Sequence, residues 1–327
     1  MTSEGTARPT GTQPGGTTGS VVAGAADAPP DTLPVPRPAW VTTGYEGEPT
    51  IVVLDDAAAL AEDAAARVAS AIDGAVEERG EAHIALTGGS SAGAFYRTLA
   101  MDPWRARIPW DRVHLWWGDE RYVPLDHRES CANIAFAILL RQSAGMGFTG
   151  SGLGGEGTDV TAGSEPGAPV PAENIHPIPV QEAIGRDLGP EWAAERYAAE
   201  LRAHVPVNDE QTPLFDVVLL GLGSDGHILS VFPDSPALDE DAPLAMSIPA
   251  PTHITPHVPR VTLNPRVVPA ARLVIVMIPG DAKAQILSEV LGGERDVRRW
   301  PGEAARCSNA VWLADRASAA MLPQPAV

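Results

Sequence analysis

The sequence predicts an α/β fold: a three-layer α/β/α sandwich with a Rossmann-like, mostly parallel sheet. Apolar runs of strand length alternate with helical patterns along most of the chain, and no internal repeat is apparent. The central observation is the stretch 215–227 (FDVVLLGLGSDGH), a mostly apolar run that ends in glycines. Such a run is typical of a strand in the middle of a parallel sheet, with helices on both faces.

Caps and periodicity define the elements in order. Asp55 or Asp56 caps an Ala-rich helix that runs to Arg79, and Gly80 ends it. Apolar runs predict strands at Ile51–Leu54, Ala82–Thr87, Val113–Gly118, Phe215–Leu220, Arg260–Leu263, Leu273–Ile278 and Ala310–Leu313. Further helices are expected after the serines at 90–91 up to Ala100, and at Ser130–Arg141, Glu191–His204, Gly280–Leu291 and Asp315–Met321.

One large domain accounts for most of the chain. Residues 1–47 are rich in Thr, Gly, Pro and Ala, so we expect a disordered tail. Residues 48–327 are expected to form a single α/β domain, interrupted at about 143–173 by a flexible Gly-rich insertion. The GSGLGGEG motif in that insertion has no strand before it and no helix after it, which argues against a phosphate loop.

Composition limits the possible partners. The 327 residues include 42 Asp and Glu against 23 Lys and Arg, a net charge of −19. This charge argues against a nucleic-acid or acidic-membrane surface, although an anionic small ligand responds to local charge. No apolar run approaches the roughly 18 residues of a membrane span, and the start has no pattern of a secretory signal. Two cysteines without a metal-binding spacing are expected of a reduced, cytoplasmic protein.

Three predicted strands end in loops rich in glycine and polar residues. These loops are Thr87-GGSS, Gly118-DER and Gly221-LGSDGH. Because open α/β sheets bind their ligands at the carboxyl ends of the strands, we expect the loops to converge on one site. Gly221, Gly223 and Gly226 also match a dinucleotide fingerprint, but Pro233 and Pro236 leave no room for the long helix that it requires.

The first two loops are suited to an anion. Gly88, Gly89, Ser90 and Ser91 offer backbone N–H groups and hydroxyls at a helix start, where a phosphate binds well. A tight turn with a serine N-cap is the simpler interpretation of that segment by itself. The sequence Asp119-Glu120-Arg121 is either a solvated charge run or part of a cleft. In a cleft Asp119 would contact substrate, and Arg121, a catalytic candidate, would suit a phosphate or a developing oxyanion.

The third loop offers a base. His227 lies two residues after Asp225 at a strand end, which favours a general base over a core or capping histidine. A single histidine among glycines fits no metal site, so we expect no metal. Arg260 starts a later strand, and Lys283, the only lysine of the chain, lies in the first turn of a helix. A lysine there is disfavoured by the helix dipole unless an anion compensates, so Arg260 and Lys283 are substrate-binding candidates.

Six stretches carry a resemblance to a known family. From about Pro49 to Met321 the chain resembles the 6-phosphogluconolactonases, of the glucosamine-6-phosphate isomerase/6-phosphogluconolactonase family. Their fold, shared with glucosamine-6-phosphate deaminase, is the NagB/RpiA/CoA transferase-like sandwich. The stretches, in order, are IALTGGSSAGAFYRTL, WWGDERYVPLDH, NIHPIPV, FDVVLLGLGSDGH, PRVTLNP and LVIVMIPGDAKAQIL.

The resemblance implies an activity and roles for residues. The expected reaction is hydrolysis of 6-phospho-D-glucono-1,5-lactone to 6-phosphogluconate in the oxidative pentose phosphate pathway, without a cofactor. His227 would activate water and Asp225 would orient it. Gly89, Ser90, Arg121, Arg260 and Lys283 would hold the substrate, chiefly its phosphate. We expect a small-molecule partner only, and a monomer is favoured.

The chain departs from the family pattern at three places. Ser91-Ala92 replaces Thr-Pro after GGS, Ile228-Leu229 replaces Thr-Ala after DGH, and Cys131 replaces a common Asn. Two alternative functions remain beside the lactonase. A glucosamine-6-phosphate deaminase carries a glutamate where this chain has Phe232, and a non-catalytic sugar-phosphate sensor would not need a base such as His227.

Overall fold

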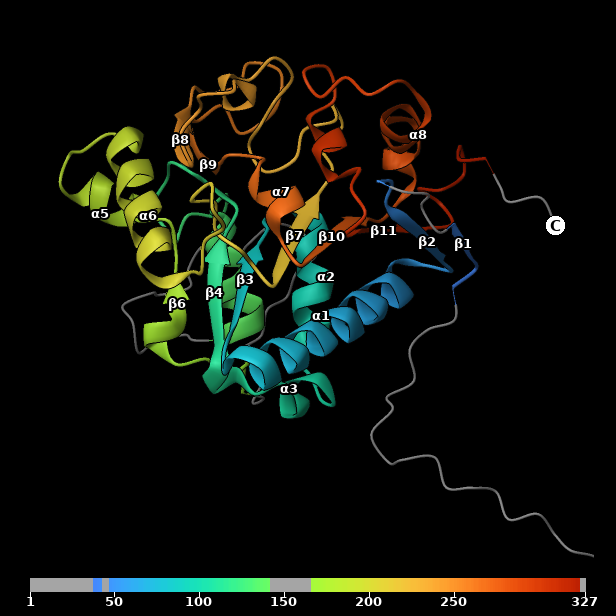
Figure 1. The fold of residues 1–327 in the computed structure, drawn as a ribbon, viewed down its shortest axis with the longest axis horizontal. Helices are drawn as coiled ribbons and strands as arrows, with labels where there is room; N and C mark the ends of the chain where they lie inside the picture. Colours follow the sequence, from blue (N-terminus) through green and yellow to red (C-terminus); the bar gives the residue numbers. More distant parts are fainter. Residues whose placement is uncertain (1–37, 43–46, 142–165, 324–327) are drawn as a thin grey trace, which may run out of the picture. The chain divides into compact units, whose positions relative to one another are not determined.

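The computed structural model describes residues 38–42, 47–141 and 166–323 (Figure 1). Most of the tail expected at 1–47 and of the insertion expected at 143–173 lies outside these ranges. Where the structure does describe them, both expected segments contain ordered backbone. Strand β1 (Trp40–Thr42) pairs with β2 (Thr50–Leu54), and Ala168 and Val170 are buried. The described part of the chain therefore includes residues before 48 and before 173.

The main sheet has the strand order β1-β2-β11-β10-β7-β3-β4-β6. Every neighbouring pair in it is parallel except β1 with β2, which confirms the predicted mostly parallel sheet. Its remaining strands are β3 (Ala82–Leu86), β4 (Val113–Trp117), β6 (Ile175–His176), β7 (Val217–Gly221), β10 (Leu273–Ile278) and β11 (Ala310–Asp315).

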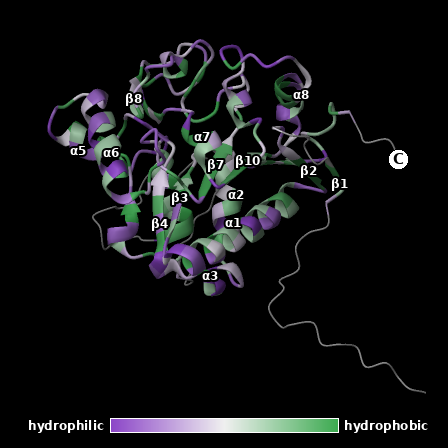
Figure 2. Ribbon diagram, viewed as in Figure 1, coloured by the Kyte–Doolittle hydropathy of each residue, from purple (hydrophilic) through white to green (hydrophobic). Residues whose placement is uncertain are grey.

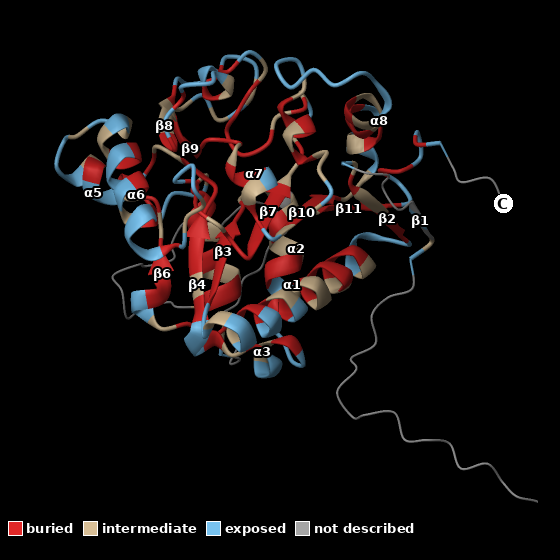
Figure 3. Cartoon of the chain, viewed as in Figure 1, coloured by how far each residue is buried: buried red, intermediate tan, exposed pale blue. Residues whose placement is uncertain are grey.

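Helices cover both faces of this sheet. All residues of β3 and β11 are buried, and consecutive residues of a strand point to opposite faces, so neither face meets solvent there (Figure 3). Strands β7 and β10 of the same sheet are mostly hydrophobic (Figure 2). Helix α1 (Ala57–Arg79) contacts four of the strands. The other α-helices are α2 (Ser90–Leu99), α3 (Trp104–Arg107), α4 (Cys131–Ile134), α5 (Val180–Gly185), α6 (Pro190–His204), α7 (Val267–Ala270) and α8 (Ala284–Gly292).

The caps of α1 are those that the sequence predicts. The Asp56 carboxylate accepts hydrogen bonds from the amides of Ala58 and Ala59, both at 2.9 Å. Gly80 ends the helix with φ of +85°, a conformation that glycine adopts without steric cost. The predicted helix at 130–141 is interrupted: α4 passes at Ala135 into a stretch of π-helix that ends at Leu140.

A second, smaller sheet lies beside the main one. Strands β5 (Asp119–Arg121), β9 (Arg260–Leu263) and β8 (Ala245–Ile248) pair antiparallel in that order. Arg260–Leu263 is thus a strand, as predicted, but it does not belong to the parallel sheet. The prediction of a helix at Asp315–Met321 is wrong, because Asp315 ends β11 and the residues after it form turns.

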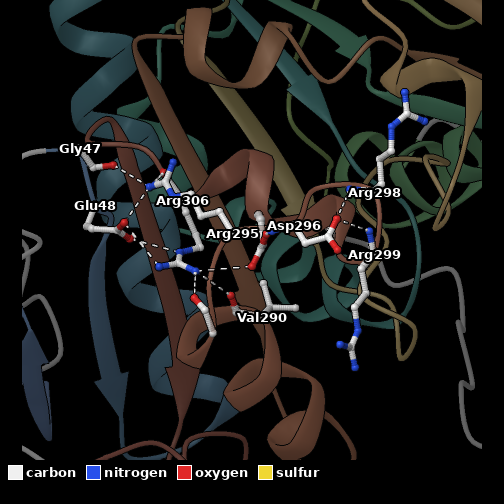
Figure 4. Close-up of polar contacts among 10 residues, drawn as sticks. Gly47, Glu48, Val290, Arg295, Asp296, Arg298, Arg299 and Arg306 are labelled. Carbon is white, nitrogen blue, oxygen red and sulfur yellow. Dashed lines mark hydrogen bonds and ion pairs between the residues drawn. The ribbon is translucent and has the colours of Figure 1, made fainter.

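The segment after α8 is held by arginines. Arg295 and Arg306 converge on the carboxylate of Glu48, with nitrogen to oxygen distances of 2.8 and 3.2 Å (Figure 4). This segment carries Trp300, whose ring lies against Gly226 so closely that a Cβ there would be 2.6 Å from it. Gly302 also donates a hydrogen bond to the Gly226 carbonyl at 2.7 Å. The C-terminal segment therefore supports the loop that follows β7.

Candidate active site

The three glycine-rich loops meet at one edge of the sheet. Strands β7, β3 and β4 are adjacent and parallel, so their carboxyl ends point the same way. The Gly118 amide donates to the Leu86 carbonyl at 3.0 Å. A Cβ built on Gly221 would lie 4.0 Å from the Ser91 hydroxyl, and Ser230 Oγ donates to Asp119 Oδ2 at 2.5 Å. The predicted convergence is confirmed.

An imidazole and a carboxylate are paired in the loop after β7. His227 Nδ1 lies 2.5 Å from Asp225 Oδ1, and both side chains are about four-fifths buried. Gly223 donates to the His227 carbonyl at 2.8 Å, and any side chain on Gly223 would collide with the His227 ring. Because the carboxylate accepts the proton of Nδ1, the opposite nitrogen, Nε2, keeps its lone pair. This is the arrangement of a general base.

No helix follows Gly226 in the way that a dinucleotide fingerprint requires. Ile228 and Val231 instead form an isolated antiparallel bridge, and the Val231 amide donates to the Ile228 carbonyl at 2.9 Å. The three glycines allow a tight loop around His227, as the sequence indicates.

Lys283 belongs to the same loop cluster. It lies at the start of α8, and its Nζ donates to the carbonyl of Leu222 at 2.7 Å. Burial lowers the pKa of Lys283, while the charge of Asp225 raises it in part. The lysine thus brings a positive charge next to the pair of His227 and Asp225, and its predicted role in binding the substrate stays a prediction.

Two arginines form a second cluster. Arg121 of β5 and Arg260 of β9 are paired directly across the antiparallel ladder. Arg121 Nη1 donates to the Glu129 carbonyl at 2.6 Å, and Arg260 Nη2 donates to the Pro256 carbonyl at 2.9 Å. The buried Nε of each has no hydrogen-bond partner among the described residues. Burial lowers the pKa of Arg260, and the neighbouring Arg121 lowers it further. Two adjacent guanidinium groups with unused donors are suited to a phosphate.

Glu120 does not neutralise these arginines by a salt bridge. Its buried carboxylate accepts hydrogen bonds from Ser130 Oγ at 2.9 Å and from the amides of Cys131 and Ala132 at 2.7 and 2.8 Å. The amide of Arg121 donates to it as well, at 2.7 Å. Burial raises the pKa of Glu120, and these donors offset part of that effect. The triplet 119–121 is therefore a buried structural strand and not a solvated charge run.

The GGSS turn lies next to the arginine cluster. A Cβ on Gly88 would collide with the Cys131 side chain, which itself lies within the electrostatic reach of Arg121 and Arg260. The N-cap of α2 is Gly89, with φ of +82°, and not a serine, so the serine N-cap interpretation is wrong. No side chain in the described part of the structure accepts a hydrogen bond from the backbone N–H groups in the first turn of α2, so these groups can meet an anion. The Ser90 side chain lies outside the described part of the structure.

Several residues of the site were not predicted. His253 Nε2 lies 2.8 Å from Asp225 Oδ2, and its Pro-rich surroundings in the sequence gave no signal of this contact. Cys131 and Glu120 support the turn and the strand as described above. An open groove of about 560 Å³ borders the site, lined by Ser224 and Asp225 and, across from them, by α8 and Trp300.

Neither a metal site nor a membrane helix is found among the residues that the structure describes. No group of three His, Cys, Asp or Glu side chains in those residues could hold a metal ion. No helix in the described ranges has the length and apolar character needed to cross a bilayer.

Sequence comparison now identifies the family. Residues 55–313 match the family of glucosamine-6-phosphate isomerases/6-phosphogluconolactonase. The chain belongs to this family. The 6-phosphogluconolactonase of Synechocystis sp. is 32% identical over 269 residues, which cover 82% of this chain and 96% of the relative. The 6-phosphogluconolactonase of Mycobacterium tuberculosis is 33% identical over 275 residues, which cover 84% of this chain and 98% of the relative.

Solved structures place the fold in the same family. The 6-phosphogluconolactonase of Trypanosoma brucei matches with a TM-score of 0.66 and 26% identity, over 85% of this chain and all of that chain. A monomeric glucosamine-6-phosphate deaminase matches with a TM-score of 0.62 over 83% of this chain and 99% of that chain. At 15% identity it shares the fold alone.

Proposed function

We propose that this chain hydrolyses 6-phospho-D-glucono-1,5-lactone to 6-phospho-D-gluconate, the lactonase step of the oxidative pentose phosphate pathway. The observation that carries the proposal is the pair of His227 and Asp225 at the carboxyl end of β7, next to a lysine and near two paired arginines. The names of the relatives that cover most of the chain support the same substrate. We further propose that the enzyme acts in the cytoplasm as a monomer.

His227 is assigned as the general base. Its Nε2 takes a proton from water, and the resulting hydroxide adds to the lactone carbonyl carbon. The negative charge that develops on the carbonyl oxygen needs a positive partner in a dry site, for which Lys283, beside Asp225, is available. The tetrahedral intermediate collapses when the bond between the carbonyl carbon and the ring oxygen breaks. The ring oxygen then takes the proton back from the imidazolium, so the base is regenerated.

Asp225 is assigned as the group that orients His227. A carboxylate on Nδ1 selects the tautomer whose Nε2 is free to accept a proton, and it stabilises the imidazolium that forms. Arg260, with Arg121 and the GGSS turn, is assigned to the substrate phosphate. The phosphate is remote from the reacting carbonyl, and holding it fixes the lactone carbonyl next to the base. Binding energy at the phosphate thereby lowers the activation free energy of the reaction.

Phe232 favours a lactonase over a deaminase. The deaminase pattern places a glutamate at this position, whereas here the Phe232 ring packs 4.8 Å from the His227 ring. An apolar ring at that point leaves no second carboxylate to take part in ring opening of an amino sugar. A non-catalytic sensor is disfavoured because the site keeps an oriented imidazole that anion binding alone does not need.

The test is a coupled assay of the purified full chain on the phosphorylated lactone, run beside a glucosamine-6-phosphate deamination assay. We expect activity on the lactone only. His227→Gln is expected to lower kcat by roughly 10²–10⁴-fold with little change in KM, because general-base assistance is worth about that much. Equal activity of His227→Gln and wild type would refute the assignment of the base, and deamination without lactonase activity would refute the function.

A further inference from the structure

Asp225 binds a second imidazole through its other oxygen. His227 Nδ1 lies 2.5 Å from Oδ1, and His253 Nε2 lies 2.8 Å from Oδ2. The carboxylate is therefore held at both oxygens by side chains from two different segments of the chain. A carboxylate with one free oxygen can rotate away from its histidine, whereas one held at both oxygens cannot do so without losing a hydrogen bond.

A single aromatic ring packs against both imidazoles. The Phe232 ring centroid lies 4.8 Å from that of His227 and 5.7 Å from that of His253, the latter in an edge-on arrangement. Phe232 is 7% exposed, so its ring is fixed by the surrounding core. Packing against one ring and bonding to one carboxylate restrict His227 and His253 together, although half of the His253 side chain is exposed.

His253 comes from the segment that also carries Arg260. This segment joins β8 to β9 and contains Pro249, Pro251, Pro256 and Pro259, which limit its backbone freedom. His257 Nδ1 lies 2.7 Å from the Pro251 carbonyl, and Arg260 donates to the Pro256 carbonyl at 2.9 Å. Hydrogen bonds within the loop therefore restrict its conformation, and its His253 side chain contacts Asp225.

The charges around Asp225 agree with this picture. Burial by itself raises the pKa of Asp225, but the hydrogen bonds and charge of His227, followed by the hydrogen bond of His253, outweigh burial and hold the pKa well below its ordinary value. The charge of Lys283 also interacts with Asp225, and Glu289 and Arg299 line the adjoining groove. Asp225 therefore stays ionised over the working pH range and accepts from both imidazoles.

We propose that His253 is a positioning residue: it fixes the second oxygen of Asp225 and so keeps His227 in the tautomer and orientation that accept a proton from water. The expected effect of His253 on the rate rests on the proposed function. Its effect on the His227 tautomer does not depend on a substrate. His253 itself does not touch the reacting atoms in this scheme.

Three variants test the proposal. His253→Ala removes the donor, and His253→Gln keeps an N–H donor without an ionisable ring. Thr252→Ala truncates an exposed side chain of the same loop without touching Asp225, and it is the matched control. We expect His253→Ala to lower kcat roughly tenfold with little change in KM, the loss typical of one hydrogen bond to a charged group. We expect His253→Gln and Thr252→Ala to stay within about threefold of wild type, since both leave Asp225 its second donor.

A spectroscopic readout separates this proposal from the proposed function. The side-chain ¹⁵N shifts of His227, assigned by comparison with His227→Gln, report which ring nitrogen carries the proton. We expect one tautomer, protonated at Nδ1, in wild type, His253→Gln and Thr252→Ala, and a mixture in His253→Ala. In kinetics, the acid limb of the pH profile of kcat/KM is expected to shift in His253→Ala only.

Two results would overturn the proposal. One is a His253→Ala variant whose His227 tautomer and pH profile equal those of wild type. The other is an equal loss in all three variants, which would mean that the loop conformation matters and the contact with Asp225 does not. A wild-type protein without lactonase activity would defeat the proposed function, yet the tautomer measurement would still decide the role of His253.

Discussion

The two ends of the parallel sheet each carry a group of histidines, and the two groups are built differently. At the carboxyl end His227 and His253 share the carboxylate of Asp225. At the amino end His83, His114, His176 and His204 are stacked on one another. Their successive ring centroids lie 4.9, 5.4 and 5.7 Å apart, and His114 Nδ1 lies 3.1 Å from His176 Nε2.

The carboxylates of Glu81 and Glu200 lie near these rings but do not restore the ordinary pKa of His83 and His114. Glu81 and Glu200 lie 3.2 to 3.6 Å from ring nitrogens, and their own side chains are partly exposed. Burial lowers the pKa of His114 to about 4, and the neighbouring His83 and His176 add to the shift. Burial also lowers the pKa of His83. The lowered pKa values keep the imidazoles of His83 and His114 neutral at pH 7.

The structural histidines and the candidate base differ in the groups that face the imidazole ring. Both ends of the sheet carry imidazoles with carboxylates within reach of their ring nitrogens. The difference is that at the carboxyl end the Asp225 carboxylate faces His227, and among the described residues no other imidazole packs against the His227 ring. This favours the imidazolium that forms when water gives up its proton. At the amino end each ring mainly faces other rings.

Removing the charge of Asp225 should have the largest effect on catalytic activity. Asp225→Asn keeps the shape of the side chain but replaces its ionised oxygen pair, so His227 loses both its tautomer preference and the partner of its imidazolium. We expect kcat to fall by roughly 10²–10⁴-fold with KM nearly unchanged, measured in the coupled lactonase assay.

Asp234→Asn is the matched control for that experiment. It removes the same charge from an exposed residue of the same loop whose backbone has φ of +57°, a conformation that Asn tolerates. This variant should behave as wild type. If both variants lose activity equally, net charge is responsible, and the contrast between the two ends of the sheet loses its meaning.

Arg260→Met should have the next largest effect, on substrate binding. Arg260 is 2% exposed and directly opposite Arg121, so its loss removes one of two cations that face the phosphate in the proposed scheme. We expect KM for the phosphorylated lactone to rise roughly 10- to 100-fold, and the unphosphorylated lactone to be turned over as by wild type.

Arg272→Met, which makes the same change at an exposed arginine, is the control and should leave both substrates unaffected. An equal loss on both substrates in Arg260→Met would show that Arg260 supports the small sheet and not the phosphate.

Local chemistry made much of this fold predictable from sequence. The caps of α1, the strand runs and the convergence of three loops depend on residues close together in the chain or on the rule for parallel strands. The helix expected at 315–321 does not form, because contacts of Asp315, one of them with a distant residue, stabilise a turn instead. Asp315 extends β11, and its carboxylate accepts from the amides of Ser318 at 2.8 Å and Gly280 at 2.9 Å, so it fastens a turn to the strand beside it.

The parts of the site that the sequence could not predict depend on contacts between residues far apart in the chain. Arg121 and Arg260 each look like candidates, but only the pairing of β5 with β9 places them side by side. His253 lies in a Pro-rich segment that predicts only an irregular loop, and its contact with Asp225 depends on how that loop folds back. The serine cap failed because Gly89, which tolerates positive φ, takes the cap position one residue earlier.

The smallest effect should come from the amino end of the sheet, where it would appear in stability. The pKa of His114 is about 4 in the folded chain against an ordinary value of 6.5, so between these values the unfolded chain binds more protons. Stability linked to His114 is therefore fully present above about pH 6.5 and is lost as pH falls toward about 4. His114→Phe keeps a stacked ring and removes the titration, so it should reduce the loss in unfolding free energy between pH 7.5 and 5 by on the order of 1 kcal/mol. Urea unfolding at the two pH values measures this, with the exposed His127→Gln as the control. A His114→Phe variant with the pH dependence of wild type would show that the stack does not resist protonation, and that the two ends of the sheet differ less than their geometry indicates.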